Sequence, residues 1–180
     1  MSQPSLSSGA GPEGADFAQG TADSVTASGP VECINFAIGE DQYGVDIMAV
    51  REIKEWTDVT HLPKQPEYVR GVLNLRGVVL PIVDLRCRFG QGLTDCTPTH
   101  IIIIVHVDGR QFGLLADKVL DIVSFDRKDV NPVPSVARSS DAHFLSGLVT
   151  VDGAMIALID LAHLLSDGVG DASSTRPLDA

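Results

Sequence analysis

Aromatic rings and positive charges are scarce in this 180-residue chain. It has nine aromatic residues, and its 13 Lys and Arg are outnumbered by 24 Asp and Glu, which gives a formal net charge of −11. Proteins that bind single-stranded nucleic acid use basic grooves with exposed aromatic rings, and anionic lipid surfaces also attract positive charge. The composition therefore argues against nucleic acid and against membrane surfaces as partners.

Cysteine pairs and long apolar runs are also missing. The three cysteines, Cys33, Cys87 and Cys96, are odd in number and form no C-x-x-C motif, as is typical of proteins in a reducing compartment. The first residues lack the basic and apolar regions of a signal peptide. The apolar run at residues 101–105 is far too short to cross a bilayer. We expect a cytoplasmic protein without a membrane-inserted segment.

The two ends of the chain differ in composition from its middle. Residues 1–30 consist mostly of Ser, Gly, Ala, Pro and Thr, with three acids and no Lys or Arg, and residues 167–180 are similar. Such segments bury too little apolar surface to offset the entropy lost on ordering. We predict disordered tails at both ends, and an ordered part over residues 31–166.

Short alternating segments separated by turn residues predict β-strands in the ordered part. Residues 34–38 alternate between two faces, as a half-buried strand does. Residues 71–84 and 147–160 each form a predicted hairpin, and Asp152-Gly153 in the second is a strong signal for a tight turn. The chain therefore belongs to the all-β class.

The two halves of the chain resemble each other. Tyr43-Gly44 matches Phe112-Gly113 at an offset of 69 residues, and Asp84-Leu85 matches Asp160-Leu161 at an offset of 76. A repeat at this spacing indicates two copies of one strand-rich unit, each ending in a hairpin and a short helix.

The repeats predict two fused small barrels. We place the first barrel at about residues 40–98 and the second at about residues 99–166. The N-terminal strand, residues 31–39, could be shared between them.

No constellation of catalytic residues is recognisable. The sequence lacks a nucleophile elbow, a phosphate-binding glycine loop and a zinc-protease helix motif. Asp84 and Asp160 could be paired carboxylates, but their equivalent places in the repeat favour two helix caps. His100 and His106 could share a metal, although a third ligand is missing. Two arginines beside Cys87 could lower its pKa, yet a semi-buried structural cysteine is the simpler interpretation. We expect neither an enzyme nor a cofactor.

Arg76 is the residue at which the two repeats differ most informatively. The first hairpin turns at Arg76-Gly77, whereas the second turns at Asp152-Gly153, which is the preferred turn sequence. A guanidinium at a hairpin tip can bind carboxylates or carbonyl groups of a partner. It could equally be a solvated or internally paired surface arginine.

Several blocks of sequence resemble the chemotaxis coupling protein family, CheW, over about residues 31–165. These blocks read YGVDI at 43–47, VREI at 50–53, PEYVRG at 66–71, GVLNLRG at 71–77 and PIVDL at 81–85. The resemblance implies two SH3-like five-stranded barrels with short helices. It also implies a non-enzymatic scaffold that joins the cytoplasmic tips of methyl-accepting chemoreceptors to the regulatory domain of the histidine kinase CheA, in arrays at the inner membrane face.

The resemblance also implies roles for individual residues. The residues expected to bind receptors are Arg76, Val50, Glu52, Asn74, Gly71 and Ile101. The residues expected to bind the kinase are Ile47, Val50 and Glu52. Asn131 and Val136 stand where a ring-closing contact is made by a basic and an aromatic residue in other members, so we expect that contact to be weak here.

Other functions remain open at this point. Within the family, the chain could serve a non-flagellar chemosensory pathway. Outside it, a small β-barrel could bind single-stranded nucleic acid, which an oligonucleotide gel shift would test. A small hydrolase would require a nucleophile that the sequence does not show, and turnover in a substrate screen would reveal it.

Overall fold

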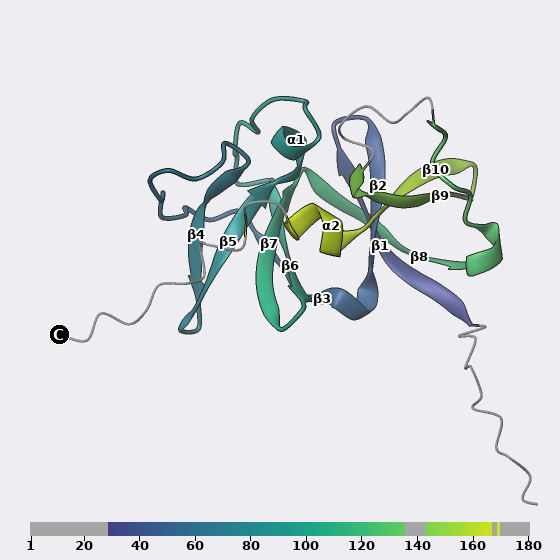
Figure 1. Ribbon diagram of the computed structural model, residues 1–180, viewed down its shortest axis with the longest axis horizontal. Coiled ribbons are helices and arrows are strands. Elements are labelled where there is room, and N and C mark those ends of the chain that lie inside the picture. The colour runs from purple at the N-terminus through teal and green to yellow at the C-terminus, as the bar shows by residue number, and fades with distance from the viewer. Residues whose placement is uncertain (1–28, 136–142, 167–168, 170–180) are drawn as a thin grey trace, which may run out of the picture.

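The computed structural model describes residues 29–135, 143–166 and 169, which form two five-stranded sheets with short helices (Figure 1). The first half contains β1 (Pro30–Ile38), β2 (Asp41–Asp46), η1 (Ile47–Ala49), β3 (Val50–Glu55), β4 (Val69–Leu75), β5 (Val78–Asp84) and α1 (Leu85–Arg88). The second half contains β6 (Ile101–Val107), β7 (Arg110–Ala116), β8 (Lys118–Asp126), η2 (Arg127–Asp129), β9 (Leu145–Val151), β10 (Ala154–Ile159) and α2 (Leu161–Ser166). The predicted all-β class, with two five-stranded units and short helices, is confirmed.

Each sheet is assembled from both repeats. Sheet A has the strand order β8-β1-β2-β10-β9, and sheet B has the order β3-β6-β7-β5-β4. The first repeat runs from β1 to α1 and the second from β6 to α2, so the two orders correspond strand for strand. In each sheet, two strands from the start of one repeat pair with three strands from the end of the other. Figure 1 shows the two sheets side by side, with α2 between them.

The expected barrel boundaries differ from this arrangement. We placed residues 40–98 in one barrel and 99–166 in the other, but β2 lies in sheet A, and β6 and β7 lie in sheet B. Strand 31–39 belongs to sheet A and is not shared between the sheets. A repeat in the sequence identifies equivalent strands, but it does not say whether a strand pairs within its own copy or with the other one. Here the strands pair across copies.

The largest hydrophobic core lies between the two sheets. It joins Phe36 and Val45 of sheet A to Ile103 and Leu114 of sheet B, and α2 adds Leu164. Each sheet also encloses a smaller core of its own. The interior of sheet A contains Cys33, Val123, Phe125, Val149, Ile156 and Leu158. The interior of sheet B contains Leu80, Ile82, Ile102, Ile104 and Leu115.

This arrangement explains why β6 is apolar on both faces. Ile103 and Val105 point into the core between the sheets, whereas Ile102 and Ile104 point into the interior of sheet B. All four side chains are fully buried. A strand buried on both faces needs no polar alternation. Among the described residues, no helix combines the length and the apolar character that crossing a membrane requires.

Gly44 and Gly113 occupy equivalent junctions between the repeats. Gly44 of β2 pairs with Leu158 of β10, and Gly113 of β7 pairs with Ile82 of β5. Both pairings are parallel, and each joins strands from different repeats. A Cβ at Gly113 would contact Ile82 Cδ1 and lie 2.8 Å from Ile102 Cγ2. The absence of a side chain lets the strands approach at this junction.

Replacing Gly113 by Ala should therefore lower the free energy of unfolding by about 1–3 kcal/mol, because the added methyl group overpacks a buried junction. Urea denaturation of Gly113→Ala measures this loss. Gly29→Ala is the control, because a Cβ there meets nothing within 4 Å. Equal stability of the two variants would contradict the packing argument.

Candidate functional site

Arg76 has a left-handed backbone conformation at the tip of the β4–β5 hairpin. Its φ is 52°, and Gly77 follows with φ 85°. Two other tight turns have almost the same geometry, with φ 49° and 79° at Asp108-Gly109 and φ 50° and 79° at Asp152-Gly153. Asp tolerates positive φ better than most residues do. Arg76 therefore takes a position for which the other two turns use the favoured residue.

The Arg76 side chain pairs with Glu52 of β3. Arg76 Nη1 donates to Glu52 Oε2 at 2.9 Å, and the Arg76 side chain is 75% exposed. Lys54 lies 3.8 Å from the other Glu52 oxygen. Asn74 supports the turn because its Oδ1 accepts a hydrogen bond from the Gly77 backbone N–H at 3.0 Å. The structure thus brings together three of the predicted receptor-binding residues, Arg76, Glu52 and Asn74.

A β-bulge in β3 separates Val50 from Glu52. Val50 pairs with Val105 and Glu52 pairs with Ile104, so Arg51 is the extra residue. Cross-strand partners share a face. Val50 therefore faces the core between the sheets, whereas Glu52 lies on the opposite face. The bulge also explains why the sequence of this segment fits no simple period.

Ile47 and Ile101 pack against the same core as Val50 and lie apart from Glu52. Ile47, Val50 and Ile101 are partly buried, and all three pack against the core between the sheets. The predicted site residues therefore form two groups. One group lies around the Arg76 hairpin, and the other lies at the margin of the central core.

Gly71 has a structural reason for lacking a side chain. Its φ is 145°, and a Cβ would contact the carbonyl oxygen of Thr60 and lie 2.9 Å from the carbonyl carbon. Thr60 and Val72 exchange backbone hydrogen bonds of 2.9 and 2.8 Å. Gly71 thus lets the segment before β4 pair with that strand.

Asn131 is the counterpart of Thr60 in sheet A. Its backbone exchanges hydrogen bonds of 2.7 and 2.8 Å with Leu148. A Cβ at the neighbouring Gly147 would lie 3.0 Å from the Asn131 carbonyl oxygen. The Asn131 side chain is exposed, and Val136, the other predicted ring-contact residue, lies outside the described residues.

Two exposed apolar side chains directly follow the Arg76-Gly77 turn, and the sequence analysis did not single them out. Val78 and Val79, which follow the turn, are 46% and 50% exposed. Ile53 of β3 is 41% exposed, but it pairs with Ile103 and therefore lies on the Val50 face of the strand, not on the Glu52 face. Exposed apolar residues that cluster at one place often mark an interaction site. The signal in the sequence was the Val-Val pair directly after Arg76-Gly77, since a half-buried strand would alternate there.

Asp84 and Asp160 cap their helices, as predicted. Asp84 accepts a hydrogen bond from the Cys87 N–H at 3.2 Å, and Asp160 accepts one from the His163 N–H at 3.2 Å. Asp84 is fully buried and also accepts hydrogen bonds from Thr94 N at 2.8 Å and Thr94 Oγ1 at 2.7 Å. Arg70 Nη1 lies 3.7 Å from it. The Asp84 oxygens are thus occupied by structural contacts.

The Cys87 thiol is not activated by the neighbouring arginines. Burial, followed by the charges of Asp84 and Glu67, raises the pKa of Cys87, and Arg70 opposes this only partly. Arg86 pairs with Asp117, while Arg88 lies between the Tyr68 and Phe144 rings. This finding supports the structural interpretation of Cys87.

The two candidate metal-binding histidines have different partners. His100 Nδ1 accepts a hydrogen bond from Thr97 N at 3.1 Å, and His100 Nε2 lies 3.5 Å from Asp117. His106 Nδ1 lies 3.5 Å from Arg51. Among the residues that the structure describes, no group of three or more His, Cys, Asp or Glu side chains could hold a metal ion.

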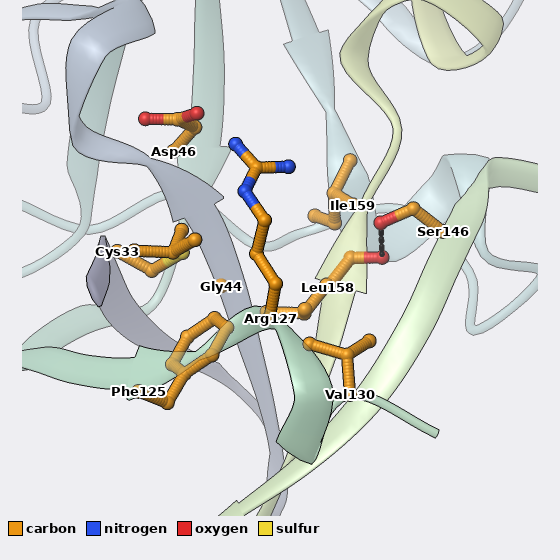
Figure 2. A pocket seen from close by; sticks show the side chains of 10 residues that line it. Cys33, Gly44, Asp46, Phe125, Arg127, Val130, Ser146, Leu158 and Ile159 are labelled. Atoms are coloured by element: carbon orange, nitrogen blue, oxygen red, sulfur yellow. Dashed lines mark hydrogen bonds between the residues drawn. The ribbon is translucent and has the colours of Figure 1, made fainter. Parts of the chain in front are cut away.

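A cavity of about 370 Å³ opens into the interior of sheet A (Figure 2). Its lining includes Cys33, Asp46 and Ser146, and the Arg127 side chain extends across it between Asp46 and Ile159. The equivalent positions in sheet B hold the larger Ile102, Leu115 and Arg70, respectively. Sheet A thus has smaller side chains than sheet B at three positions that line this cavity.

Cys33 in this cavity is also an unreactive thiol. Burial, with a further contribution from the charge of Asp46, raises the pKa of Cys33 to about 11. The thiol therefore stays protonated at neutral pH and is a poor nucleophile.

Asp117 connects three elements near the boundary of the sheets. Its Oδ2 accepts hydrogen bonds of 2.6 Å from the Gly39 N–H and from Arg86 Nη2. Its Oδ1 lies 3.5 Å from His100 Nε2. Burial raises the pKa of Asp117, but the hydrogen bonds from Arg86 and Gly39 and the positive charge of Arg86 outweigh burial. The net pKa is lowered from 3.8.

Comparison with known proteins identifies relatives over most of the described region. A family model described as a CheW-like domain matches residues 32–169. The chain is 43% identical over 134 residues to the chemotaxis protein CheW of Rhizobium meliloti, which covers 74% of this chain and 86% of that protein. It is 34% identical over 135 residues to the chemotaxis protein CheW of Klebsiella aerogenes, with 75% and 81% covered.

A solved structure shows the same fold. The scaffolding protein TtCheW from Thermoanaerobacter tengcongensis matches with a TM-score of 0.70 and 34% identity, over 76% of this chain and 88% of that chain. The similarity therefore extends from the sequence to the arrangement of the two sheets.

Replacing Asp84 by Ala should cost about 3–5 kcal/mol of unfolding free energy, because it leaves buried donors and a nearby arginine without their acceptor. The matched variant Asp160→Ala removes a more exposed cap of the same kind and should cost about 1 kcal/mol. Urea denaturation of both variants checks the difference. Equal losses would show that the Asp84 network adds nothing to a simple cap.

Asp117 should stabilise the fold in a pH-dependent way. Since its pKa is lower in the folded state, its contribution is complete above pH about 4 and is lost as the pH falls through the lowered value. The unfolding free energy of Asp117→Asn should therefore depend less steeply on pH between about 5 and about 2. Parallel pH profiles for the variant and the wild type would contradict this assignment.

Proposed function

The chain belongs to the CheW-like family of chemotaxis proteins, and on that premise we propose that it is a non-catalytic scaffold that couples chemoreceptors to the histidine kinase CheA. The receptor side of this function lies at the Arg76 hairpin, and the kinase side includes Ile47, Val50 and Glu52. By this proposal the protein works in receptor arrays at the cytoplasmic face of the membrane.

The observation that carries the proposal is the unfavourable backbone position of Arg76. Left-handed φ is costly for a long side chain, and two turns of the same geometry use Asp instead. The exposed ion pair with Glu52 stabilises the fold by at most about 1 kcal/mol. Folding therefore gives little reason for an arginine here. A strained residue at an exposed tip is consistent with a function in binding.

The surroundings of Arg76 suit a helical partner. Val78 and Val79 provide exposed apolar side chains directly after the turn, and Arg76 provides several hydrogen-bond donors beside them. An amphipathic helix binds to such a surface through its apolar face and adds polar contacts at the rim. The tip of a chemoreceptor is a helical hairpin and would supply this face.

The remaining predicted residues have supporting functions in this proposal. Asn74 and Gly71 maintain the geometry of the hairpin and of the adjoining segment. Ile101 fixes β6 against the central core, behind β3. Asn131 contributes a weak ring contact through its exposed side chain, since its backbone is already paired with Leu148.

Replacing Arg76 by Asp should abolish receptor coupling without unfolding the protein, because the turn then has the sequence of the two Asp-Gly turns. The measurement is a pull-down of a receptor cytoplasmic fragment and the CheA regulatory domain, with circular dichroism to confirm the fold. We expect at least about a tenfold loss of receptor binding, which corresponds to about 1.4 kcal/mol.

Asp152→Arg is the matched control, because it places an arginine in the equivalent turn of sheet A. This variant should bind receptors as the wild type does. Wild-type receptor binding by Arg76→Asp, or equal losses in both variants, would contradict the proposed site.

A further inference from the structure

We propose that this chain can form a dimer with a second copy of itself by exchanging repeats, so that the first repeat of each copy completes both sheets with the second repeat of the other. The exchange would open the turn at residues 97–100, which joins the repeats. The partner surface is the set of strand edges that the two repeats already present to each other.

The first argument comes from the strand pairing. Each sheet has four neighbouring strand pairs, and two of the four join different repeats, namely β1–β8 and β2–β10 in sheet A and β3–β6 and β5–β7 in sheet B. The hairpin pairs β1–β2, β4–β5, β6–β7 and β9–β10 remain within one repeat. A second repeat supplied by another copy would make the same hydrogen bonds, because none of these pairs depends on the covalent link.

The second argument comes from the contacts of the linker. Thr94 and Cys96 are held by the first repeat, through Asp84 and Arg70 respectively. The second repeat begins at His100, whose carbonyl extends the pairing of β6 with β3 through Trp56 N at 2.9 Å. The segment between these anchors is therefore the natural hinge.

The hinge itself is one exposed turn. The His100 N–H donates to the Thr97 carbonyl at 3.0 Å, and Pro98 occupies the second position of the turn. Thr97, Pro98 and Thr99 are all exposed. Opening this turn breaks that hydrogen bond and the contacts of His100 Nδ1 with Thr97 N at 3.1 Å and Thr97 Oγ1 at 2.9 Å. All of these are local contacts of the turn, which the exchanged form could make again at the far end of an extended hinge. The monomer and the exchanged dimer then differ mainly in the conformation of the hinge.

Concentration decides between the two forms. A flexible link of this length gives the second repeat an effective concentration on the order of millimolar near its own first repeat. The monomer is therefore favoured at ordinary concentrations. Shortening the hinge removes the chain reversal that the monomer needs and should favour the exchanged dimer.

An exchanged dimer would carry two complete Arg76 surfaces. Arg76 and Glu52 lie on strands β4–β5 and β3 of the same repeat, so their ion pair is not divided by the exchange. The dimer would thus present two copies of the surface described above, whichever partner that surface binds. Dimer formation itself does not depend on the proposed function.

The test uses the full-length chain with a protease site inserted after Gly92, in the exposed loop before Thr94. One variant also lacks Pro98 and Thr99, and the control instead has Gly-Ser-Gly-Ser inserted between them. Light scattering after gel filtration should show a dimer for the deletion variant and a monomer for the control. Because only the linkers join the two halves of an exchanged dimer, cutting them should reduce the dimer to particles of monomer mass.

A mixture of isotopically light and heavy copies identifies the exchange directly. After joint refolding and cutting of the deletion variant, native mass spectrometry should detect particles with one light and one heavy repeat. A monomeric deletion variant, or a dimer that survives the cut, would overturn the proposal.

If the deletion variant does not fold, the cuttable chain without the deletion is refolded at about millimolar concentration, where exchange should become detectable. A dimer fraction that falls to monomer mass on cutting supports the proposal. The absence of such a fraction overturns it.

Discussion

Pairing between the two repeats is the constraint on which the rest of this structure depends. Neither repeat can build a five-stranded sheet from its own strands, because the two strands that begin a repeat and the three that end it lie in different sheets. The largest core then forms where the two sheets face each other, and β6 must be apolar on both faces. Gly44 and Gly113 also reflect this pairing, since each lies where a strand of one repeat pairs in parallel with a strand of the other.

The two halves are nearly symmetric, and they differ in the residues that stand at some equivalent positions. Asp152 suits its tight turn, whereas Arg76 takes the same backbone geometry with a residue that gains little stability from it. Cys33 lines a cavity in sheet A, whereas the larger Ile102 takes the equivalent place in the buried core of sheet B. The fold tolerates such differences because the strand pairing is the same in both sheets and both repeats contribute to the central core. Folding constrains the shared positions, and binding can use the divergent ones.

Much of the fold followed from the sequence, but the division into sheets did not. Turn residues and alternation located the strands, and the offset repeat predicted the two helix caps at Asp84 and Asp160, which the structure confirms. Repeats cannot reveal whether strands pair within a copy or between copies, since both choices bury the same side chains. The proximity of Arg76 to Glu52 was likewise invisible, because it depends on how β3 and the β4–β5 hairpin converge and on the bulge at Arg51. The exposed pair Val78 and Val79 could have been recognised from its break in alternation.

Native-state hydrogen exchange tests the central claim most directly, because it reports the opening free energy of each backbone amide. If both repeats are needed to complete each sheet, the slowest amides of β1, β2 and β10 in sheet A and of β5, β6 and β7 in sheet B should share one opening free energy, equal to that of global unfolding. Two distinct values, one for residues 30–88 and another for residues 101–166, would show that each repeat is stable by itself and would contradict the account.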